Sequence, residues 1–250
     1  MSASLSVALI AYNEASRLAR TLDSVKGLAD EIILMDSEST DDTVEIAQSY
    51  GAQVIVQPWL GYTAQKNALF EQCHCDFILN LDCDEVLTPA LCTEIRQVLS
   101  HPKHTGYTLA RQTHYLGKLL THSWHPDRKL RLVKRSAHPK WQGAYVHERL
   151  TVQGSEGHLS APLIHYSYAN ARQHFEKTVD YAHLAAKAAY EAGRVCHGRH
   201  LVLNPMFAFL RMYVFRLGLI DGWRGFAAAK SAAIYTFLKY WFLWEKCHDK

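Results

Sequence analysis

The sequence predicts an α/β fold, with a mostly parallel sheet flanked by helices and followed by a helical C-terminal extension. Short apolar segments alternate with amphipathic helical patterns over residues 1–99, which is typical of parallel strands joined by helical crossovers. Further strand-like segments follow between about residues 106 and 168, and from residue 170 the pattern is helical almost to the end. The 250 residues are 48% hydrophobic and 20% charged, which excludes a disordered chain or a disulfide-stapled miniprotein.

The first four strands are expected at residues 5–11, 31–35, 52–56 and 76–81. Each is a short and nearly continuous apolar run, as in strands that are buried on both faces. The first connection repeats apolar side chains at helical spacing, at Leu18, Leu22 and Val25. Thr88 is a good N-cap, with Pro89 in the first turn of a helix that ends near residue 99.

The cysteines predict a reducing environment. The six of them follow no paired framework, and the N-terminus lacks the basic start and long apolar stretch of a secretory signal peptide. We therefore expect a cytoplasmic protein. Cys73, Cys75 and Cys83 lack a second correctly spaced Cys/His pair, so ordinary thiols are expected in preference to a zinc site.

Polar side chains follow three of the predicted strands, at residues 12–14, 36–42 and 82–85. In an open parallel sheet the ligand crevice lies beyond the carboxyl ends of the strands. Asp82 and Asp84 stand two residues apart at such an end, where both can approach one hard cation, so the pattern favours Mg²⁺ or Mn²⁺. Solvated loop acids are the alternative, but the three polar strand ends lie in register, which favours a cation site.

Two nucleotide-binding motifs are missing from the chain. The turn at residues 11–16 has no glycines that would let the backbone close on a pyrophosphate, and no G-x-x-x-x-G-K-[ST] loop occurs. A nucleotide diphosphate in this crevice would therefore need a metal ion and cationic side chains to balance its charge.

Four motifs, at residues 11–14, 36–43, 61–67 and 82–85, resemble glycosyltransferase family two, whose GT-A fold is Rossmann-like. The second half, with residues 125–128, Arg131, Trp141 and residues 146–148, looks like the bacterial lipopolysaccharide inner-core β-1,4-glucosyltransferases. This resemblance implies an inverting enzyme that transfers glucose from UDP-glucose to a heptose of the inner core.

The resemblance also implies which residues hold the donor. The expected contacts to the uridine and its phosphates are Ala11, Tyr12, Glu14, Asp36 and Lys66. Many family members carry a second acid directly after the position of Asp36, whereas this chain has Ser37, so the base contact must come from Asp36 or from backbone.

The metal ligands implied by the resemblance are Asp84, Asp82 and His165. Asp82 is expected near both the ribose and the metal, and Asp84 as a direct ligand. His165 resembles the later histidine that completes the metal site in several relatives. Since the chain has 15 histidines, an ordinary hydrogen-bonded His is the alternative for this position.

Inverting transfer requires a base that takes the proton from the acceptor hydroxyl. Between residue 99 and the helical tail the acids are Asp127, Glu148 and Glu156. We predict Glu148, which matches the V-H-E motif of the family. Asp127 is the second candidate, although an ion pair with Arg128 or Arg131 would make it a poorer base. The alternative role for Glu148 is a salt bridge with Arg149 or a neighbour.

The charge is distributed unevenly along the chain. The net charge is +3, but residues 1–99 carry 5 Lys and Arg against 15 Asp and Glu, whereas residues 100–250 carry 22 against 9. Cations interleaved with aromatic rings between residues 111 and 149 suit a lipid-linked anionic saccharide acceptor. They could also bind single-stranded nucleic acid or form a solvated surface, but no nucleic-acid motif accompanies them, so no nucleic-acid partner is expected.

Two apolar stretches, residues 201–220 and 226–244, raise the question of a membrane span. Arg211, Arg216 and other charges interrupt them, so spanning is not expected. Basic amphipathic helices of this kind can attach peripherally to the inner face of the inner membrane, beside a lipid-linked acceptor. Packing against the sheet domain or a second subunit is the alternative.

We accordingly predict a GT-A catalytic domain at residues 1–170 and a helical, membrane-associating region at residues 171–250. Within the first, residues 1–99 bind the nucleotide sugar and residues 100–170 the acceptor. A different donor or acceptor within the family remains an alternative. A sugar nucleotidyltransferase would need a glycine-rich basic loop that is missing after the first strand, and a non-catalytic RNA- or membrane-binding protein would not explain the polar strand ends.

Overall fold

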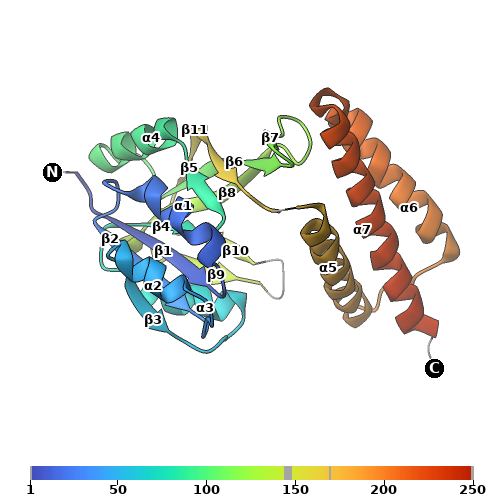
Figure 1. Ribbon diagram of the computed structural model, residues 1–250, viewed down its shortest axis with the longest axis horizontal. Coiled ribbons are helices and arrows are strands. Elements are labelled where there is room, and N and C mark those ends of the chain that lie inside the picture. Colours follow the sequence, from blue (N-terminus) through green and yellow to red (C-terminus); the bar gives the residue numbers. More distant parts are fainter. Residues whose placement is uncertain (1, 144–147, 169, 249–250) are drawn as a thin grey trace. The chain divides into compact units, whose positions relative to one another are not determined.

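The computed structural model describes residues 2–143, 148–168 and 170–248 (Figure 1). The chain forms two compact units. The first comprises Met1–Arg111 and Asp127–His165, and the second comprises Gln112–Pro126 and Tyr166–Lys250.

Four parallel strands form the first half of the main sheet in the first unit. They are β1 (Leu5–Ala11), β2 (Glu31–Asp36), β3 (Gln53–Val56) and β4 (Phe77–Leu81), in the spatial order β3-β2-β1-β4. Ala11 pairs with Asp36 and Leu9 pairs with Leu81, so the carboxyl ends of β1, β2 and β4 lie along one edge. The predicted α/β class and its four leading strands are confirmed.

The second half of the sheet is antiparallel. It continues from β4 through β8 (Asp127–Lys134), β6 (Gly106–Tyr115), β11 (Glu156–His165) and β5 (Glu85–Leu87), and β7 (Lys118–Leu119) pairs with the end of β6. Among the described residues, a separate hairpin is formed by β9 (Lys140–Gln142) and β10 (Arg149–Thr151), and the short turn η1 (Arg135–Ala137) follows β8. Leu132 of β8 lies opposite Leu79 of β4, which brings Arg131 to the polar end of β4.

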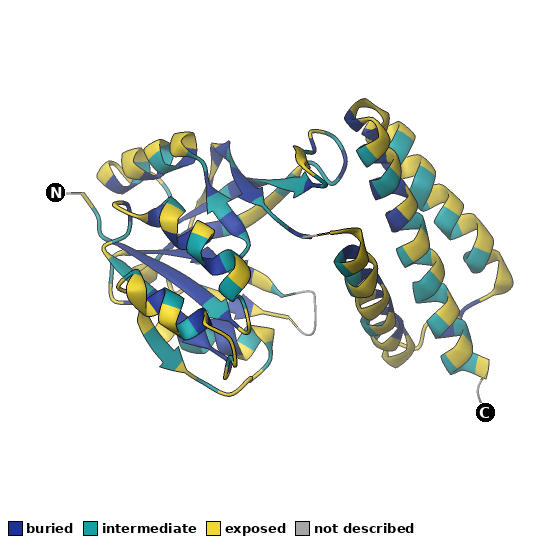
Figure 2. Cartoon of the chain, viewed as in Figure 1, coloured by how far each residue is buried: buried dark blue, intermediate teal, exposed yellow. Residues whose placement is uncertain are grey.

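Helices cover both faces of this sheet. The strands of the sheet are the most buried part of the first unit (Figure 2). Successive side chains of β1 point to opposite faces of the sheet. Leu5, Val7 and Leu9 therefore pack in one apolar cluster, and Ala8 packs in the other. The first cluster includes side chains from α1 (Ala15–Val25), α2 (Thr43–Ser49) and α4 (Pro89–Ser100), and the second includes side chains from α3 (Tyr62–Glu71). Cys73 and Cys83 are free thiols buried in these two clusters.

The second unit is mainly helical, and it also contains β7 and the last four residues of β6. Its helical elements are α5 (Ala171–Glu191), α6 (Gly198–Leu210), the π-helical turn η2 (Arg211–Phe215), the 3-10 turn η3 (Gly218–Asp221) and α7 (Trp223–His248). Pro205 lies inside α6 and does not end it, although its nitrogen donates no helical hydrogen bond and its ring crowds the preceding turn. None of the helices in the described part of the chain is both long and apolar enough to cross a membrane.

The segment Gln112–Pro126 belongs to the helical unit, whereas the division drawn from the sequence assigns it to the sheet domain. Buried Asp221 is the physical reason. Its carboxylate accepts hydrogen bonds from the N–H groups of Thr121, His122 and Ser123 at 2.9, 3.1 and 2.7 Å. Burial raises the pKa of Asp221, but the hydrogen bonds from Ser123 and Thr121 outweigh this and lower the pKa to about 2. Charge-assisted bonds of this kind fix the segment to η3.

A buried histidine joins three parts of the helical unit. His174 of α5 has 1% of its surface exposed. The Tyr115 hydroxyl lies 2.8 Å from Nδ1 of the ring, and the Ser231 hydroxyl of α7 lies 2.7 Å from Nε2. The rings of Trp124 and Tyr168 pack against the imidazole. Burial lowers the pKa of His174 to about 4, so the ring is neutral at pH 7 and one of its nitrogens donates while the other accepts.

We expect the stability of this unit to fall as the pH is lowered from about 6.5 to about 4. In the unfolded chain His174 binds a proton near its ordinary pKa of 6.5, but in the folded chain it does so only near 4. The unfolded state therefore binds more protons in this window, and each pKa unit corresponds to about 1.4 kcal/mol. Thermal unfolding of the full chain at several pH values measures this effect. His174→Gln should remove this part of the pH dependence, and the exposed control His101→Gln should retain it. An identical pH profile in wild type and His174→Gln would contradict the prediction.

Candidate active site

The loops that follow β1 and β2 are held together at the carboxyl edge of the sheet. Asn13 and Glu38 adopt the left-handed backbone conformation, with φ of 52° and 63°, which residues other than glycine rarely do. The side-chain oxygen of Asn13 accepts a hydrogen bond from Thr40 N–H at 2.8 Å, and Asn13 N–H donates to the Ser39 hydroxyl at 2.9 Å. The two loops thus form a fixed rim.

Four residues predicted to contact the donor lie at this rim. Ala11 is buried at the end of β1, and Tyr12 beside it has 60% of its surface exposed. Asp36 ends β2 almost fully buried, and its carboxylate accepts hydrogen bonds from the N–H and hydroxyl of Ser39 at 2.8 and 2.5 Å. Glu14 occupies the N-cap position of α1. The rim therefore presents an exposed aromatic ring next to a fixed carboxylate.

Arg131 links the acidic side chains at the end of β4. One of its nitrogens, Nη2, lies 2.6 Å from both Asp82 Oδ2 and Glu85 Oε1, and Nη1 donates to Asn80 at 3.1 Å. Burial raises the pKa of Asp82, but Arg131 and Lys66 outweigh this and hold the pKa below its ordinary value. Burial lowers the pKa of Arg131, yet Asp82 and Glu85 raise it overall. Since a buried charge without a partner is costly, the network fixes the Asp82 carboxylate in place.

Lys66 of α3 brings the predicted base to the same edge. Lys66 has 4% of its surface exposed. Its ammonium lies 3.3 Å from Glu148 Oε1, 4.0 Å from Asp82 Oδ1 and 4.2 Å from the ring centroid of Trp141. The ion pair of Glu148 is thus with Lys66, a residue 82 positions away. Glu148 Oε2 and Trp141 Nε1 are buried with no hydrogen-bond partner among the described residues. One acceptor atom and one donor atom beside the ammonium are therefore left unsatisfied by the described residues.

Asp84 directly precedes β5 and faces His165, the last residue of β11. His165 Nε2 lies 3.4 Å from Asp84 Oδ1, and Arg17 lies 3.5 Å from Asp84 Oδ2 and 2.7 Å from Glu14. Burial raises the pKa of Asp84, but the hydrogen bond and charge of His165 outweigh it and lower the pKa.

This pair places one carboxylate oxygen and one imidazole nitrogen side by side. The described residues contain no group of three or more His, Cys, Asp or Glu placed to hold a metal on their own. Mg²⁺ commonly takes one or two carboxylates and fills its remaining positions with substrate phosphates and water. The carboxylate oxygen is a ligand type that suits Mg²⁺ or Mn²⁺, and the imidazole nitrogen is one that suits later transition metals such as Zn²⁺. Asp82, the third expected ligand, contacts Arg131 instead.

Asp127 is held by a different set of cations. Arg111 lies 2.6 Å from its carboxylate through Nη2 and 2.8 Å through Nε, and Lys129 lies at 3.6 Å. Burial raises the pKa of Asp127, but Arg111 and Lys129 outweigh it and lower the pKa. The partners expected from the sequence bind elsewhere, because Arg128 donates to a backbone carbonyl and Arg131 to other acids. Of the two predicted bases, Glu148 has fewer cationic partners among the described residues than Asp127.

Sequence reasoning gave no site role to Arg17, Arg111 or Glu85. Arg17 follows Glu14 by three residues, and that helical spacing could have indicated the ion pair. Glu85 stands within the polar segment that includes Asp82, but its side chain is fully buried against the two arginines. Arg111 lies 16 and 26 positions from its partners, so no local pattern could have identified it.

Comparison with known proteins identifies the family of this chain. The model of the family described as glycosyl transferase family 2 matches residues 6–151. The chain is 32% identical over 246 residues to the lipopolysaccharide core biosynthesis glycosyltransferase LpsC of Rhizobium meliloti, and the match covers 94% of this chain and 89% of that protein.

Two solved structures share the fold. The mannosyltransferase PcManGT from Pyrobaculum calidifontis, in complex with GDP-Man and Mn²⁺, superposes with a TM-score of 0.57 at 13% identity, covering 100% of this chain and 88% of the other. TarS of S. aureus, residues 1–349 in complex with UDP-GlcNAc, gives a TM-score of 0.50 at 10% identity, covering 98% and 92%.

Proposed function

We propose a donor, an acceptor class and a mechanism for this chain, which belongs to glycosyl transferase family 2. The donor proposed is UDP-glucose, with the uridine at the rim formed by Tyr12 and Asp36. Support comes from the exposed ring beside the fixed carboxylate, and from the TarS complex with UDP-GlcNAc. The observation that carries the proposal is the gathering of Asp82, Asp84 and Glu148 with Lys66 at one edge of the sheet.

We propose that Asp84 and His165 would hold a divalent cation, Mg²⁺ or Mn²⁺. The PcManGT complex with Mn²⁺ and the donor set of the pair support this. When bound, the cation supplies positive charge for the departing diphosphate. The second acid, Asp82, is kept ionised by Arg131 and Lys66, and in this proposal it accepts hydrogen bonds from the ribose.

In the proposed reaction Glu148 acts as the base. The acceptor hydroxyl oxygen attacks the anomeric carbon of glucose, its proton passes to Glu148, and the bond from that carbon to the diphosphate oxygen breaks to release UDP. Glu148 Oε2 has no hydrogen-bond partner among the described residues and can receive the proton, while Lys66 fixes the other oxygen. The stereochemical outcome is inversion, because attack and departure occur on opposite sides.

The acceptor proposed is a heptose of the lipopolysaccharide inner core. LpsC, by its name, acts in lipopolysaccharide core biosynthesis. The cations and aromatic rings between residues 111 and 149 suit an anionic saccharide. A lipid-linked acceptor would place the enzyme at the inner face of the inner membrane, attached through the basic helices of the second unit.

A donor screen tests the proposal. Hydrolysis of UDP-, GDP- and TDP-sugars is measured with and without Mn²⁺, and the active donor is then offered to a defined heptose acceptor. We expect metal-dependent turnover of UDP-glucose and transfer to the heptose. Preference for a GDP-sugar, the donor class present in the PcManGT complex, would overturn the proposed donor. Turnover that is equal with and without the cation would overturn the metal site.

A further inference from the structure

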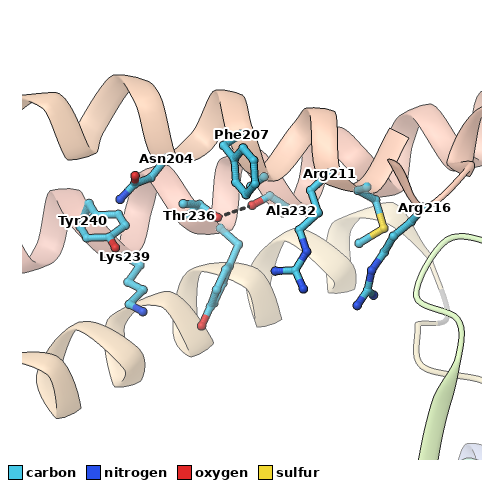
Figure 3. A pocket seen from close by; sticks show the side chains of 11 residues that line it. Asn204, Phe207, Arg211, Arg216, Ala232, Thr236, Lys239 and Tyr240 are labelled. Atoms are coloured by element: carbon cyan, nitrogen blue, oxygen red, sulfur yellow. Dashed lines mark hydrogen bonds between the residues drawn. The ribbon is translucent and has the colours of Figure 1, made fainter. Parts of the chain in front are cut away.

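The helical unit contains a cavity of about 450 Å³ between α6, η2 and α7 (Figure 3). This volume lies within the roughly 300–1,000 Å³ of small-molecule sites. Arg211, Arg216 and Lys239 line it, and Figure 3 shows Arg211 and Arg216 extending to the same side. Arg211 begins the π-helical turn, a deviation from α-helix that is frequent at functional sites.

The cations of this cavity have no acidic counterpart. Among the described residues no Asp or Glu lines the cavity, and none of the three cations has an ion pair within 4 Å. A neighbouring cavity of about 230 Å³ shares Lys239 and adds Arg194. Burial lowers the pKa of Lys239, and the charge of Arg194 from that neighbouring cavity lowers it further. An anionic ligand would relieve this repulsion.

The rest of the wall is mainly apolar or aromatic. Phe207, Met212 and Tyr235 line the cavity, and Asn204 and Thr236 add an amide and a hydroxyl. Two guanidinium groups and an ammonium match the several oxygens of a phosphate, which arginine binds through paired hydrogen bonds. An inorganic phosphate would fill only a small part of the volume, so the apolar wall is left for the group that carries it.

Exposed apolar side chains on the same elements indicate what that group is. Phe207 has 59% of its surface exposed and Phe215 has 72%. A surface that combines apolar rings with unpaired cations suits the boundary between lipid headgroups and acyl chains. We propose that this cavity binds the phosphate headgroup of an anionic lipid. The site gives the proposed membrane attachment a defined ligand, and it does not depend on the donor site.

The test measures binding of dihexanoyl phosphatidic acid, below its micelle concentration, to the full chain without nucleotide. Wild type should bind this probe, and Arg211→Gln or Lys239→Gln should weaken binding about tenfold or more, because each removes a charged hydrogen bond to phosphate. The matched control is Arg199→Gln, which removes an exposed arginine of α6 that does not line the cavity. This control should bind like wild type.

Three results would overturn the inference. The first is that wild type fails to bind the probe. The second is that Arg199→Gln loses as much affinity as Arg211→Gln, because this would indicate unspecific attraction to basic helices. The third is that a hexose phosphate binds as tightly as the lipid, which would replace the lipid by a soluble phosphate. Since the assay contains no sugar nucleotide, any of these results leaves the proposed transfer reaction intact. Circular dichroism confirms that each variant is folded.

Discussion

Glu148→Gln is expected to lower kcat by about 10²–10⁴-fold while the affinity for UDP stays the same. The glutamine amide keeps an oxygen within reach of Lys66, which lies 3.3 Å from Glu148 Oε1, so the local geometry is retained. What is lost is the group that takes the acceptor proton. The measurement is kcat for transfer to the heptose acceptor, together with the Kd of UDP by calorimetry.

Two acids of the second half of the chain serve as controls for this prediction. Glu156→Gln changes an exposed acid at the start of β11 and should leave kcat near wild type. Asp127→Asn tests the second candidate base, whose carboxylate is held by Arg111. If Glu148→Gln kept near-wild-type turnover while Asp127→Asn lost it, the role of base would pass to Asp127.

Much of the first unit could be predicted because its signals are local. The apolar runs of β1 and β4 and the spacing of Leu18, Leu22 and Val25 each report on a few consecutive residues. The Thr88 cap is of the same kind, since its hydroxyl accepts a hydrogen bond from Leu91 N–H at 3.2 Å. Parallel connectivity then places the polar strand ends on one edge.

The detailed ion pairing could not be predicted, because it joins residues that are distant in sequence. Lys66 reaches Glu148 across 82 positions, and Arg131 reaches Asp82 across 49. Which of several nearby arginines takes a given carboxylate depends on strand register, as with Arg111 and Asp127 across the β6–β8 pair. The placement of Gln112–Pro126 in the helical unit has the same origin, since buried Asp221 fixes it from about 100 positions away.

Asp84→Ala is expected to abolish the effect of Mn²⁺ on UDP-sugar binding and to reduce turnover by about 10²-fold or more. The variant removes the carboxylate of the Asp84–His165 pair, and a bound divalent cation supplies several kcal/mol of charge stabilisation to a leaving diphosphate. Arg17 keeps its 2.7 Å ion pair with Glu14, so the fold should persist. His165→Gln should act in the same direction, whereas Glu71→Ala, an exposed acid of α3, should have no effect. Calorimetric titration of UDP with and without Mn²⁺ measures the change, and an unchanged response to Mn²⁺ in both site variants would move the cation elsewhere in the crevice.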